Sequence, residues 1–299
     1  MIKIKLLITT GLLILLIPVL DKGIRPSPNT VLNQKNITSK VSNEISQIIK
    51  TVEATNQQVE RSQTQLSKEE NNQTKPAGYC LNVPILMYHH IQPQSTAIEK
   101  WQTNFTVDNG TFDNQMAYLA SSGYTTVSLD QLALALTNHQ ALPPKSIVLT
   151  FDDGYEDIYT YAYPTIKKYQ LKTNLMIPTG LMENIDYLTW SQLKEMSSSG
   201  LVSAYNHTWS HANLASVSQT KMESEVQTAQ RQLTDNLGTS PKILAYPYGQ
   251  ISQNITNYLS QNGFLAAVST IGGQIQCNSF IMTLHRTRIG NSPLSSYGI

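Results

Sequence analysis

The sequence has no excess of charge of either sign and very little cysteine. Its 299 residues contain 21 lysines and arginines against 20 acidic residues, a formal net charge of +1. This balance indicates no electrostatic attraction to nucleic acid or to an acidic membrane surface. Cys80 and Cys277 are the two cysteines, and neither has the histidine-rich neighbourhood of a cysteine nucleophile. Outside the cytoplasm they are able to form one disulfide, and two unpaired thiols are the alternative.

Residues 1–22 have the pattern of a targeting segment. Lys3 and Lys5 precede an apolar stretch from Leu6 to Leu20, which is long for a signal peptide and shorter than the ~20 residues of a full membrane span. No A-x-A-like cleavage site follows and no cysteine is available for lipid attachment, so an uncleaved signal-anchor is favoured over a cleaved signal peptide. Positive charge before the apolar stretch places the bulk of the chain outside. We therefore expect an extracytoplasmic protein, anchored in the cell membrane, or secreted to the cell wall if the segment is cleaved.

Residues 23–78 form a polar linker with almost no aromatic side chains. Within residues 41–66, apolar side chains recur at alternating spacings of four and three, a pattern typical of a coiled coil. Thr55 and Ser62 interrupt it, so a helical stalk that self-associates competes with a plain solvated linker. We favour a marginal helix that acts as a spacer. Residues 67–77 are expected to be disordered.

From residue 79 onward, strand-like apolar runs alternate with helical patterns. Strands separated by helices of this length indicate βα units and a parallel sheet. Six or seven such units favour a closed or nearly closed barrel, whose active site lies at the carboxyl ends of the strands. No internal repeat is apparent. The expected strands are 83–88, 124–127, 146–151, 173–178, 201–205, 242–246 and 264–268, and the expected helices are 112–123, 128–136, 158–170, 190–199, 218–237 and 252–262.

Two adjacent carboxylates, Asp152 and Asp153, follow the expected strand 146–151. Because side chains alternate along a strand, the two cannot face the same way without a turn, and Gly154 permits one. One carboxylate can then bind a metal ion while the other faces the substrate. Taken alone, Asp-Asp-Gly is more typical of a turn or a helix N-cap.

Two imidazoles, His207 and His211, lie four residues apart. If this segment makes a helical turn, both lie on one face, with a spacing that zinc sites use. Alone, such a pair is as typical of solvated or core-capping histidines. Combined with Asp-Asp-Gly, it supplies one carboxylate and two imidazoles, which leaves coordination positions open for water and substrate as a catalytic zinc requires.

Three runs together resemble a known family: Thr-Phe-Asp-Asp-Gly from Thr150, His-Thr-Trp-Ser-His from His207, and Tyr-Pro-Tyr-Gly from Tyr246. They are similar to the motifs of the polysaccharide deacetylases of carbohydrate esterase family 4, the NodB-homology domain. The resemblance covers residues 79–299, with a motif core at about 144–299. It implies an α/β fold, the distorted (β/α)7 barrel of that family.

Two further segments narrow the resemblance. Pro84 to His90, followed by Gln-Met-Ala-Tyr-Leu from Gln115 and by Gly123-Tyr124, is similar to the branch that contains biofilm poly-N-acetylglucosamine deacetylases. The substrate class that this implies is an extracellular N-acetylglucosamine polymer. Peptidoglycan and O-acetylated xylan-like chains are the alternatives within the same chemistry.

The resemblance also implies roles for individual residues. Asp152 corresponds to the general base, and Asp153, His207 and His211 to the metal ligands, with zinc as the expected ion and cobalt or nickel as alternatives. The backbone N–H of Tyr248 corresponds to the group that stabilises the tetrahedral oxyanion, although a Tyr-Pro-Tyr-Gly run alone is more typical of a simple turn.

Cleavage of an amide also needs an acid that protonates the leaving amine. His89, in the Met-Tyr-His-His-Ile run, matches the acid of the biofilm branch, and we prefer it. His285, which follows an apolar run near the C-terminus, matches the acid of many other family members. For each, a hydrogen-bonded histidine at the barrel rim is the structural alternative, and His90 and His139 are expected to be structural.

The chain departs from the family pattern in two places. The arginine that often precedes the Pro-x-Gly motif and orients the base is absent, because Ile-Leu-Ala-Tyr stands at residues 243–246. Arg286 or Arg288 replaces it, or no residue does. The Asp-x-x-Asp-Trp motif is also absent, since no aspartate follows Asp235, which leaves the orientation of the acid open.

These patterns predict a metal-dependent hydrolase that removes N-acetyl groups from an extracellular polysaccharide. A non-catalytic surface protein that only binds glycan is the alternative of another class. An adhesin built on the stalk would fit residues 41–66 but leave the barrel unexplained. The complete set of Asp152, Asp153, His207 and His211 argues for the enzyme, since a binding module has no need of it.

Overall fold

The computed structural model describes residue 43, residues 45–52, residue 55 and residues 78–299. The predicted signal-anchor and most of the predicted linker lie outside these residues. Within the described residues, no helix is both long and apolar enough to span a bilayer. Residues 45–52 are helical and expose Ile45, Ile48 and Val52. This agrees with a helix in the predicted stalk, while its self-association stays a prediction.

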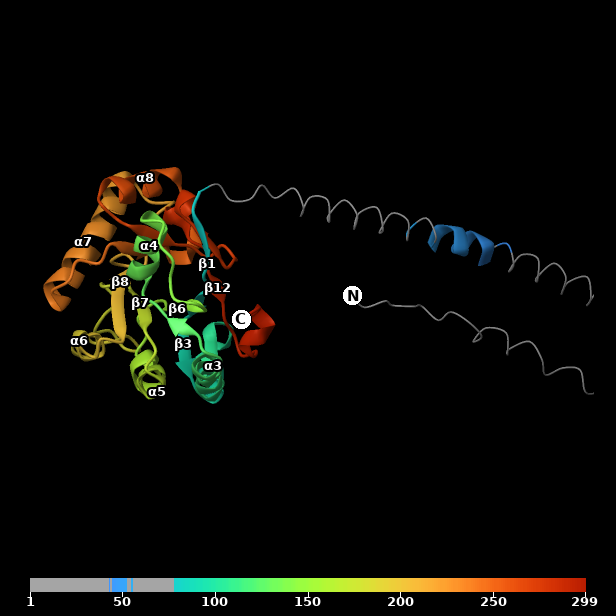
Figure 1. Cartoon of the computed structure of the whole chain (residues 1–299), viewed down its shortest axis with the longest axis horizontal. Coiled ribbons are helices and arrows are strands. Elements are labelled where there is room, and N and C mark those ends of the chain that lie inside the picture. The colour runs from blue at the N-terminus through green and yellow to red at the C-terminus, as the bar shows by residue number, and fades with distance from the viewer. Residues whose placement is uncertain (1–42, 44, 53–54, 56–77) are drawn as a thin grey trace, which may run out of the picture. The chain divides into compact units, whose positions relative to one another are not determined.

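A curled parallel sheet forms the centre of the second unit of the chain, Lys75–Ile299 (Figure 1). Its strand order is β10-β9-β8-β7-β6-β2-β12, with β5 paired to the first half of β6. Helices lie around the outside of the sheet. The predicted βα architecture is therefore confirmed. The strands are β2 (Ile85–Tyr88), β5 (Thr125–Thr126), β6 (Ser146–Phe151), β7 (Thr173–Ile177), β8 (Val202–Asn206), β9 (Ile243–Ala245), β10 (Ala266–Val268) and β12 (Thr287–Arg288).

The chain before β12 links the two ends of this strand path. Leu284 donates a backbone hydrogen bond to Ala267 of β10 (2.9 Å) and accepts one from Ser269 (2.8 Å). Three residues later, β12 pairs in parallel with β2. The segment from Leu284 to Arg288 thus lies between the last strand and the first, and the Arg286 side chain reaches from it to Asp152 inside the curled sheet.

Strand β6 is buried along its whole length. All six of its residues are buried, because helices cover one face and the opposite wall of the curled sheet covers the other. Ile147, Leu149 and Phe151 pack in one cluster, whereas Val148 packs in another. By alternation Thr150 shares the inner side of Val148, and the next residue on that side is Asp152.

The helical segments begin within one residue of the predicted positions, except the helix predicted at 112–123, which begins at Asn109. Ser128 and Thr189 each form a capping box with the glutamine three residues later, and Ser218 and Ser252 cap the two long C-terminal helices. The predicted helix 158–170 begins as a π-helical stretch, Ile158–Ala162, before it continues as α5. The helices are α3 (Asn109–Ser121), α4 (Leu129–Thr137), α5 (Tyr163–Tyr169), α6 (Trp190–Ser198), α7 (Gln219–Leu237) and α8 (Gln253–Gln261).

Several short elements were not predicted because strands of three residues carry too little periodicity to be seen. β3 (His90–Gln92) pairs with β4 (Thr106–Asp108), and the helix α2 (Gln94–Glu99) lies between them in the chain. β1 (Cys80–Asn82) pairs in antiparallel register with β11 (Ile275–Cys277). In that pair Cys80 and Cys277 form a disulfide, which decides between the two alternatives left by the sequence and ties the start of the folded unit to its C-terminal part.

Candidate active site

The two carboxylates stand at the carboxyl end of β6. Asp152 extends the sheet by one hydrogen bond, since its N–H donates to the carbonyl of Tyr88 (3.0 Å). The chain then turns sharply, with positive φ at Asp153 (73°) and Gly154 (67°). A side chain at Gly154 would also meet Ile177 at 3.3 Å. The predicted turn is confirmed, and it allows both carboxylates to face one cavity.

His207 and His211 converge through a loop, and the helical turn that the sequence analysis considered does not form. β8 ends at Asn206, whose side-chain oxygen accepts the N–H of Thr208 (2.8 Å). The Thr208 hydroxyl accepts the N–H of Ala212 (3.1 Å), and both Thr208 and His211 have positive φ. Polar side chains thus take up the backbone donors that a helical turn would have used.

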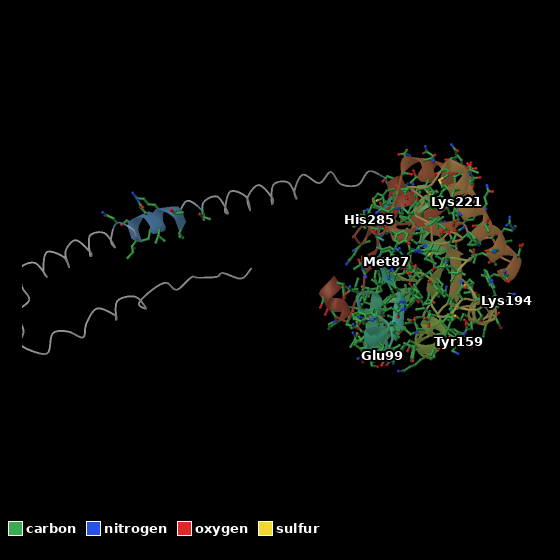
Figure 2. The ribbon with its side chains drawn as sticks, turned by 180° about the vertical axis from the view of Figure 1, so that it is seen from behind. Met87, Glu99, Tyr159, Lys194, Lys221 and His285 are labelled. Atoms are coloured by element: carbon green, nitrogen blue, oxygen red, sulfur yellow. A yellow bond between two sulfur atoms is a disulfide. The ribbon has the colours of Figure 1, made fainter. Side chains whose placement is uncertain are left out.

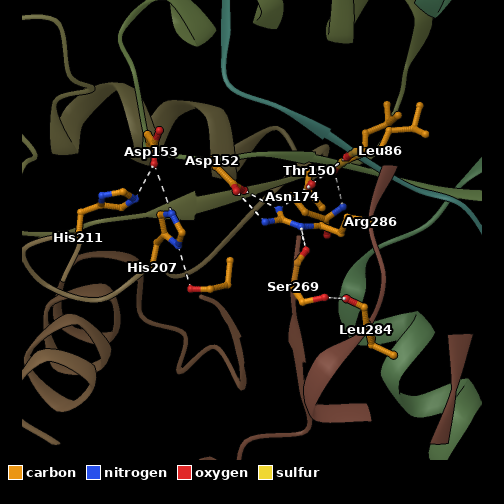
Figure 3. A network of polar contacts seen from close by, with 12 residues as sticks. Leu86, Thr150, Asp152, Asp153, Asn174, His207, His211, Ser269, Leu284 and Arg286 are labelled. Carbon is orange, nitrogen blue, oxygen red and sulfur yellow. Dashed lines mark hydrogen bonds and ion pairs between the residues drawn. The ribbon is translucent and has the colours of Figure 1, made fainter. Parts of the chain in front are cut away.

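Asp153 meets both imidazoles (Figure 3). Its Oδ1 lies 3.3 Å from His207 Nε2 and 3.1 Å from His211 Nε2. The Nδ1 of His207 donates to the carbonyl of Ala245 (2.9 Å), and this bond leaves its Nε2 as an acceptor in the neutral ring. An acceptor nitrogen that faces a carboxylate oxygen fits a cation between them. Within the part of the chain that the structure describes, this is the one cluster of three such side chains near enough to share a metal ion.

Asp152 is bound by Arg286 rather than by the metal-ligand cluster (Figure 3). The guanidinium donates to both carboxylate oxygens, at 2.7 Å each, and also to the Ser269 carbonyl and the Thr150 hydroxyl. Asp152 and Arg286 are both buried. Burial alone would raise the pKa of Asp152, but the Arg286 guanidinium outweighs it and holds the pKa below its usual value.

Arg286 therefore makes the contact with the base that was expected of the arginine missing before Pro247. The other candidate, Arg288, lines the same cavity, but its guanidinium lies 4.6 Å from the ring centre of Phe105 and donates to the carbonyl of Asn104. The choice that the sequence left open is decided by these contacts.

His89 and His285 lie in different surroundings. His89 follows β2, faces the cavity with Asp152 and Asp153, and has its ring edge against Phe105. Burial lowers the pKa of His89, while the two carboxylates oppose that shift. His285 instead stacks on Phe280, with ring centres 4.6 Å apart, because successive side chains point to opposite sides and that of Arg286 points inward.

The Tyr-Pro-Tyr-Gly run forms the predicted tight turn. Tyr248 has a φ of 60°, and the edge of its ring packs on His211 with ring centres 4.6 Å apart. Gly249 also has positive φ, and a side chain there would lie 1.9 Å from the hydroxyl of Thr270, so this position requires glycine. The assignment of the Tyr248 N–H to an oxyanion stays a prediction.

These groups share one cavity of about 690 Å³. All six predicted site residues line it: His89, Asp152, Asp153, His207, His211 and Tyr248. His90, predicted to be structural, also reaches it but is held by Asp157 (2.5 Å) and stacked on Tyr155. His139 stacks on Tyr79 instead. The aromatic rim formed by Trp101 and Phe105 was not predicted.

Glu225 on α7 is a buried residue near the site that the sequence analysis missed. Its carboxylate accepts the backbone N–H groups of Trp209 (3.0 Å) and Ser210 (2.7 Å), the Ser210 hydroxyl (2.7 Å) and the Lys221 ammonium (2.7 Å). It thus fixes the loop between the two histidines. A lone glutamate in a helical pattern gives no sequence signal of this role.

Replacement of Glu225 by alanine is expected to weaken divalent-metal binding by about 10–100-fold, the range for residues that orient metal ligands. Without the carboxylate, two backbone donors lose their partner and His211 is no longer held in its left-handed conformation. The measurement is zinc affinity by competition with a chromophoric chelator. Glu223→Ala, on the same helix and partly exposed, is the matched control. Wild-type affinity in a folded Glu225→Ala protein would contradict the role.

Comparisons with known proteins identify the family of this chain. The family profile described as polysaccharide deacetylase matches residues 139–267. The deacetylase PplD of Streptococcus pyogenes, solved in complex with acetate, has 30% identity and a TM-score of 0.65, over 71% of this chain and 94% of that one. YxkH of Bacillus subtilis, whose name assigns it to the polysaccharide deacetylases, is 28% identical over 77% of this chain and 80% of its own.

The name of a third relative includes its substrate. The poly-β-1,6-N-acetyl-D-glucosamine N-deacetylase of Staphylococcus aureus is 29% identical over 164 residues, which are 50% of this chain and 56% of that enzyme. This chain thus spans little more than half the length of the staphylococcal enzyme. The chain belongs to the polysaccharide deacetylase family.

Proposed function

We propose that this deacetylase removes N-acetyl groups from N-acetylglucosamine units of an extracellular poly-N-acetylglucosamine. The observation that carries the proposal is the pairing of an ionised, arginine-bound Asp152 with the Asp153–His207–His211 cluster in one cavity. The name of the staphylococcal relative supports the polymer, and the predicted targeting segment 1–22 supports the location. Peptidoglycan and acetylxylan are the alternative substrates, and binding of glycan without catalysis is the alternative function.

A divalent ion held by Asp153, His207 and His211, with zinc expected and cobalt or nickel as alternatives, would polarise a water and the acetamide carbonyl. Asp152 then takes the proton of the attacking water as general base, and Arg286 keeps its carboxylate ionised and oriented. The Tyr248 N–H stabilises the oxyanion. His89 delivers a proton to the departing amine; burial lowers the pKa of this imidazole, and the neighbouring carboxylates oppose that shift.

Acetate release from three polymers tests the proposal. The full chain, loaded with zinc, is incubated with poly-β-1,6-N-acetylglucosamine, with peptidoglycan and with acetylxylan, and acetate is measured enzymatically. We expect the fastest release from poly-N-acetylglucosamine. If either of the other two polymers releases acetate faster, that polymer becomes the assigned substrate. Binding to glycan with no acetate release from any polymer would favour the non-catalytic alternative.

Substitution of His89 and of His285 by alanine separates the two acid candidates. We expect His89→Ala to lower kcat by about 10²–10⁴-fold, the usual contribution of a general acid, because this imidazole faces the reacting groups. His285→Ala, stacked outside the cavity, is expected to retain kcat within a few-fold. The steady-state rates of the two purified variants on the same substrate decide, and a larger loss in His285→Ala would reverse the assignment.

A further inference from the structure

We propose that Trp101 and Phe105 form a binding platform for a second sugar of the polymer, an N-acetylglucosamine unit next to the one that loses its acetyl group. This Trp101–Phe105 platform rests on the proposed function and extends it, because it makes the enzyme selective for chains over single sugars. Four features of the described residues carry it: exposure, backbone conformation, anchoring and continuity with the catalytic cavity.

The Trp101 side chain is almost wholly uncovered. It is 95% exposed, although it lines the same cavity as Asp152 and Asp153. Exposed single apolar residues are common, but a fully exposed tryptophan at the mouth of a polar cavity leaves a large apolar surface in water. Its backbone φ is +57°, a left-handed conformation that is unfavourable for a bulky residue. Strained residues of this kind cluster at ligand sites.

The backbone around Trp101 is fixed on both sides. Its N–H donates to the Ile98 carbonyl (3.2 Å), and the next N–H, of Gln102, donates to Ala97 (2.8 Å). Lys100 pairs with Asp186 at 2.7 Å. In Figure 2, Glu99 at the end of α2 lies at the outer edge of the unit, and Met87 of the cavity wall lies nearer its middle. The indole is therefore presented by a rigid segment, which lowers the entropy lost on binding.

Phe105 connects the platform to the reacting groups. It is 50% exposed, its ring contacts the edge of His89 with ring centres 5.4 Å apart, and the Arg288 guanidinium covers it at 4.6 Å from the ring centre. His89, Phe105 and Trp101 all line the same cavity, so both aromatic rings are available to a chain that enters it. The cavity of about 690 Å³ is large for one acetamido group and falls within the usual range for ligands of several rings.

The chemistry of the platform fits a hexosamine ring. The axial C–H groups of a β-linked sugar form an apolar face that stacks on an aromatic ring, and its hydroxyl and carbonyl oxygens can accept from the Arg288 guanidinium. Ile98 and Ile185 are also exposed, at 60% and 90%, but the Lys100–Asp186 ion pair and Arg288 place charged groups beside the two aromatic rings. Aromatic rings beside such polar donors favour a sugar over a lipid surface.

The test compares a single sugar with a chain. Acetate release is measured with the zinc-loaded full chain on N-acetylglucosamine and on its β-1,6-linked tetrasaccharide, for the wild type, Trp101→Ala and Trp101→Phe. We expect Trp101→Ala to raise KM for the tetrasaccharide about tenfold, equivalent to about 1.4 kcal/mol, with little change on the single sugar. Trp101→Phe should keep most of the wild-type KM. Leu134→Ala, an exposed apolar residue on α4, is the control.

Each other outcome has a defined meaning. Equal KM in wild type and Trp101→Ala overturns the platform, as does an equal loss on both substrates. If Trp101→Ala differs from the wild type only in sedimenting less with phosphatidylglycerol vesicles, Trp101 binds a membrane. That result would also overturn the platform. If the wild type releases no acetate from the tetrasaccharide, the proposed polymer is wrong. The platform is then judged by tetrasaccharide binding to Asp152→Asn with and without Trp101, and binding that is independent of Trp101 rejects it.

Discussion

Alanine at Asp153 or at His211 is expected to abolish metal retention and deacetylation together. Each side chain supplies one of the three ligand atoms, and all three lie within 4.8 Å of one another. Two protein ligands hold a metal ion more weakly than three. In Asp153→Ala, the Nε2 of His207 would also face no carboxylate. The expected rate of acetate release is the background rate, and the expected zinc content after gel filtration is near zero.

Metal content by atomic emission and acetate release are measured on the same preparations. His139→Ala removes an imidazole that stacks on Tyr79 away from the cavity, and it should retain both zinc and activity. Chelation of the wild type should remove activity, and added zinc should restore it. Activity that survives in both Asp153→Ala and His211→Ala would overturn the assignment of the cluster.

Local sequence patterns predicted the strands and helices that carry the site. β6 begins and ends at the predicted residues, 146 and 151, because a fully buried strand is rich in apolar side chains and the charged Asp152 follows its last residue. The caps at Ser128 and Ser218 likewise act on backbone donors within the same turn. Since the carboxyl ends of parallel strands meet at one edge of the sheet, the residues that follow them were predicted to converge, and they do.

Contacts between residues distant in the chain could not be predicted in this way. Arg286 lies 134 residues from Asp152, and the sequence offered Arg288 equally. The direction of the two side chains depends on how the segment after Leu284 lies between β10 and β2, which is a property of the whole curled sheet. Glu225 lies on α7 and binds the loop between His207 and His211. The loop itself escaped prediction because a spacing of four suits a helical turn as well as the side-chain bonds that form.

Methionine at Arg286 is expected to lower both the activity and the stability of the protein. The substitution leaves the Asp152 carboxylate buried without its partner, and removal of one member of a buried ion pair typically costs about 3–5 kcal/mol. The pKa of Asp152 lies below its usual value in the folded protein, so the pair contributes stability at neutral pH that is lost as the pH falls through that pKa. The unfolding free energies of wild type and variant should therefore differ at pH 7 and converge in acid.

The same substitution should raise the pKa of Asp152, since burial is then no longer opposed by the guanidinium. A general base with a higher pKa is ionised only at higher pH, so the acidic limb of the kcat/KM profile should move upward. Arg231→Met, at an exposed position of α7, controls for the loss of an arginine. In the double variant Asp152→Asn/Arg286→Met, the buried charge is gone. It should therefore regain much of the stability lost in Arg286→Met while remaining inactive, a result that separates the cost of an unpaired carboxylate from a general loss of packing. An unchanged profile and an unchanged unfolding free energy in Arg286→Met would show that the arginine does not control the base.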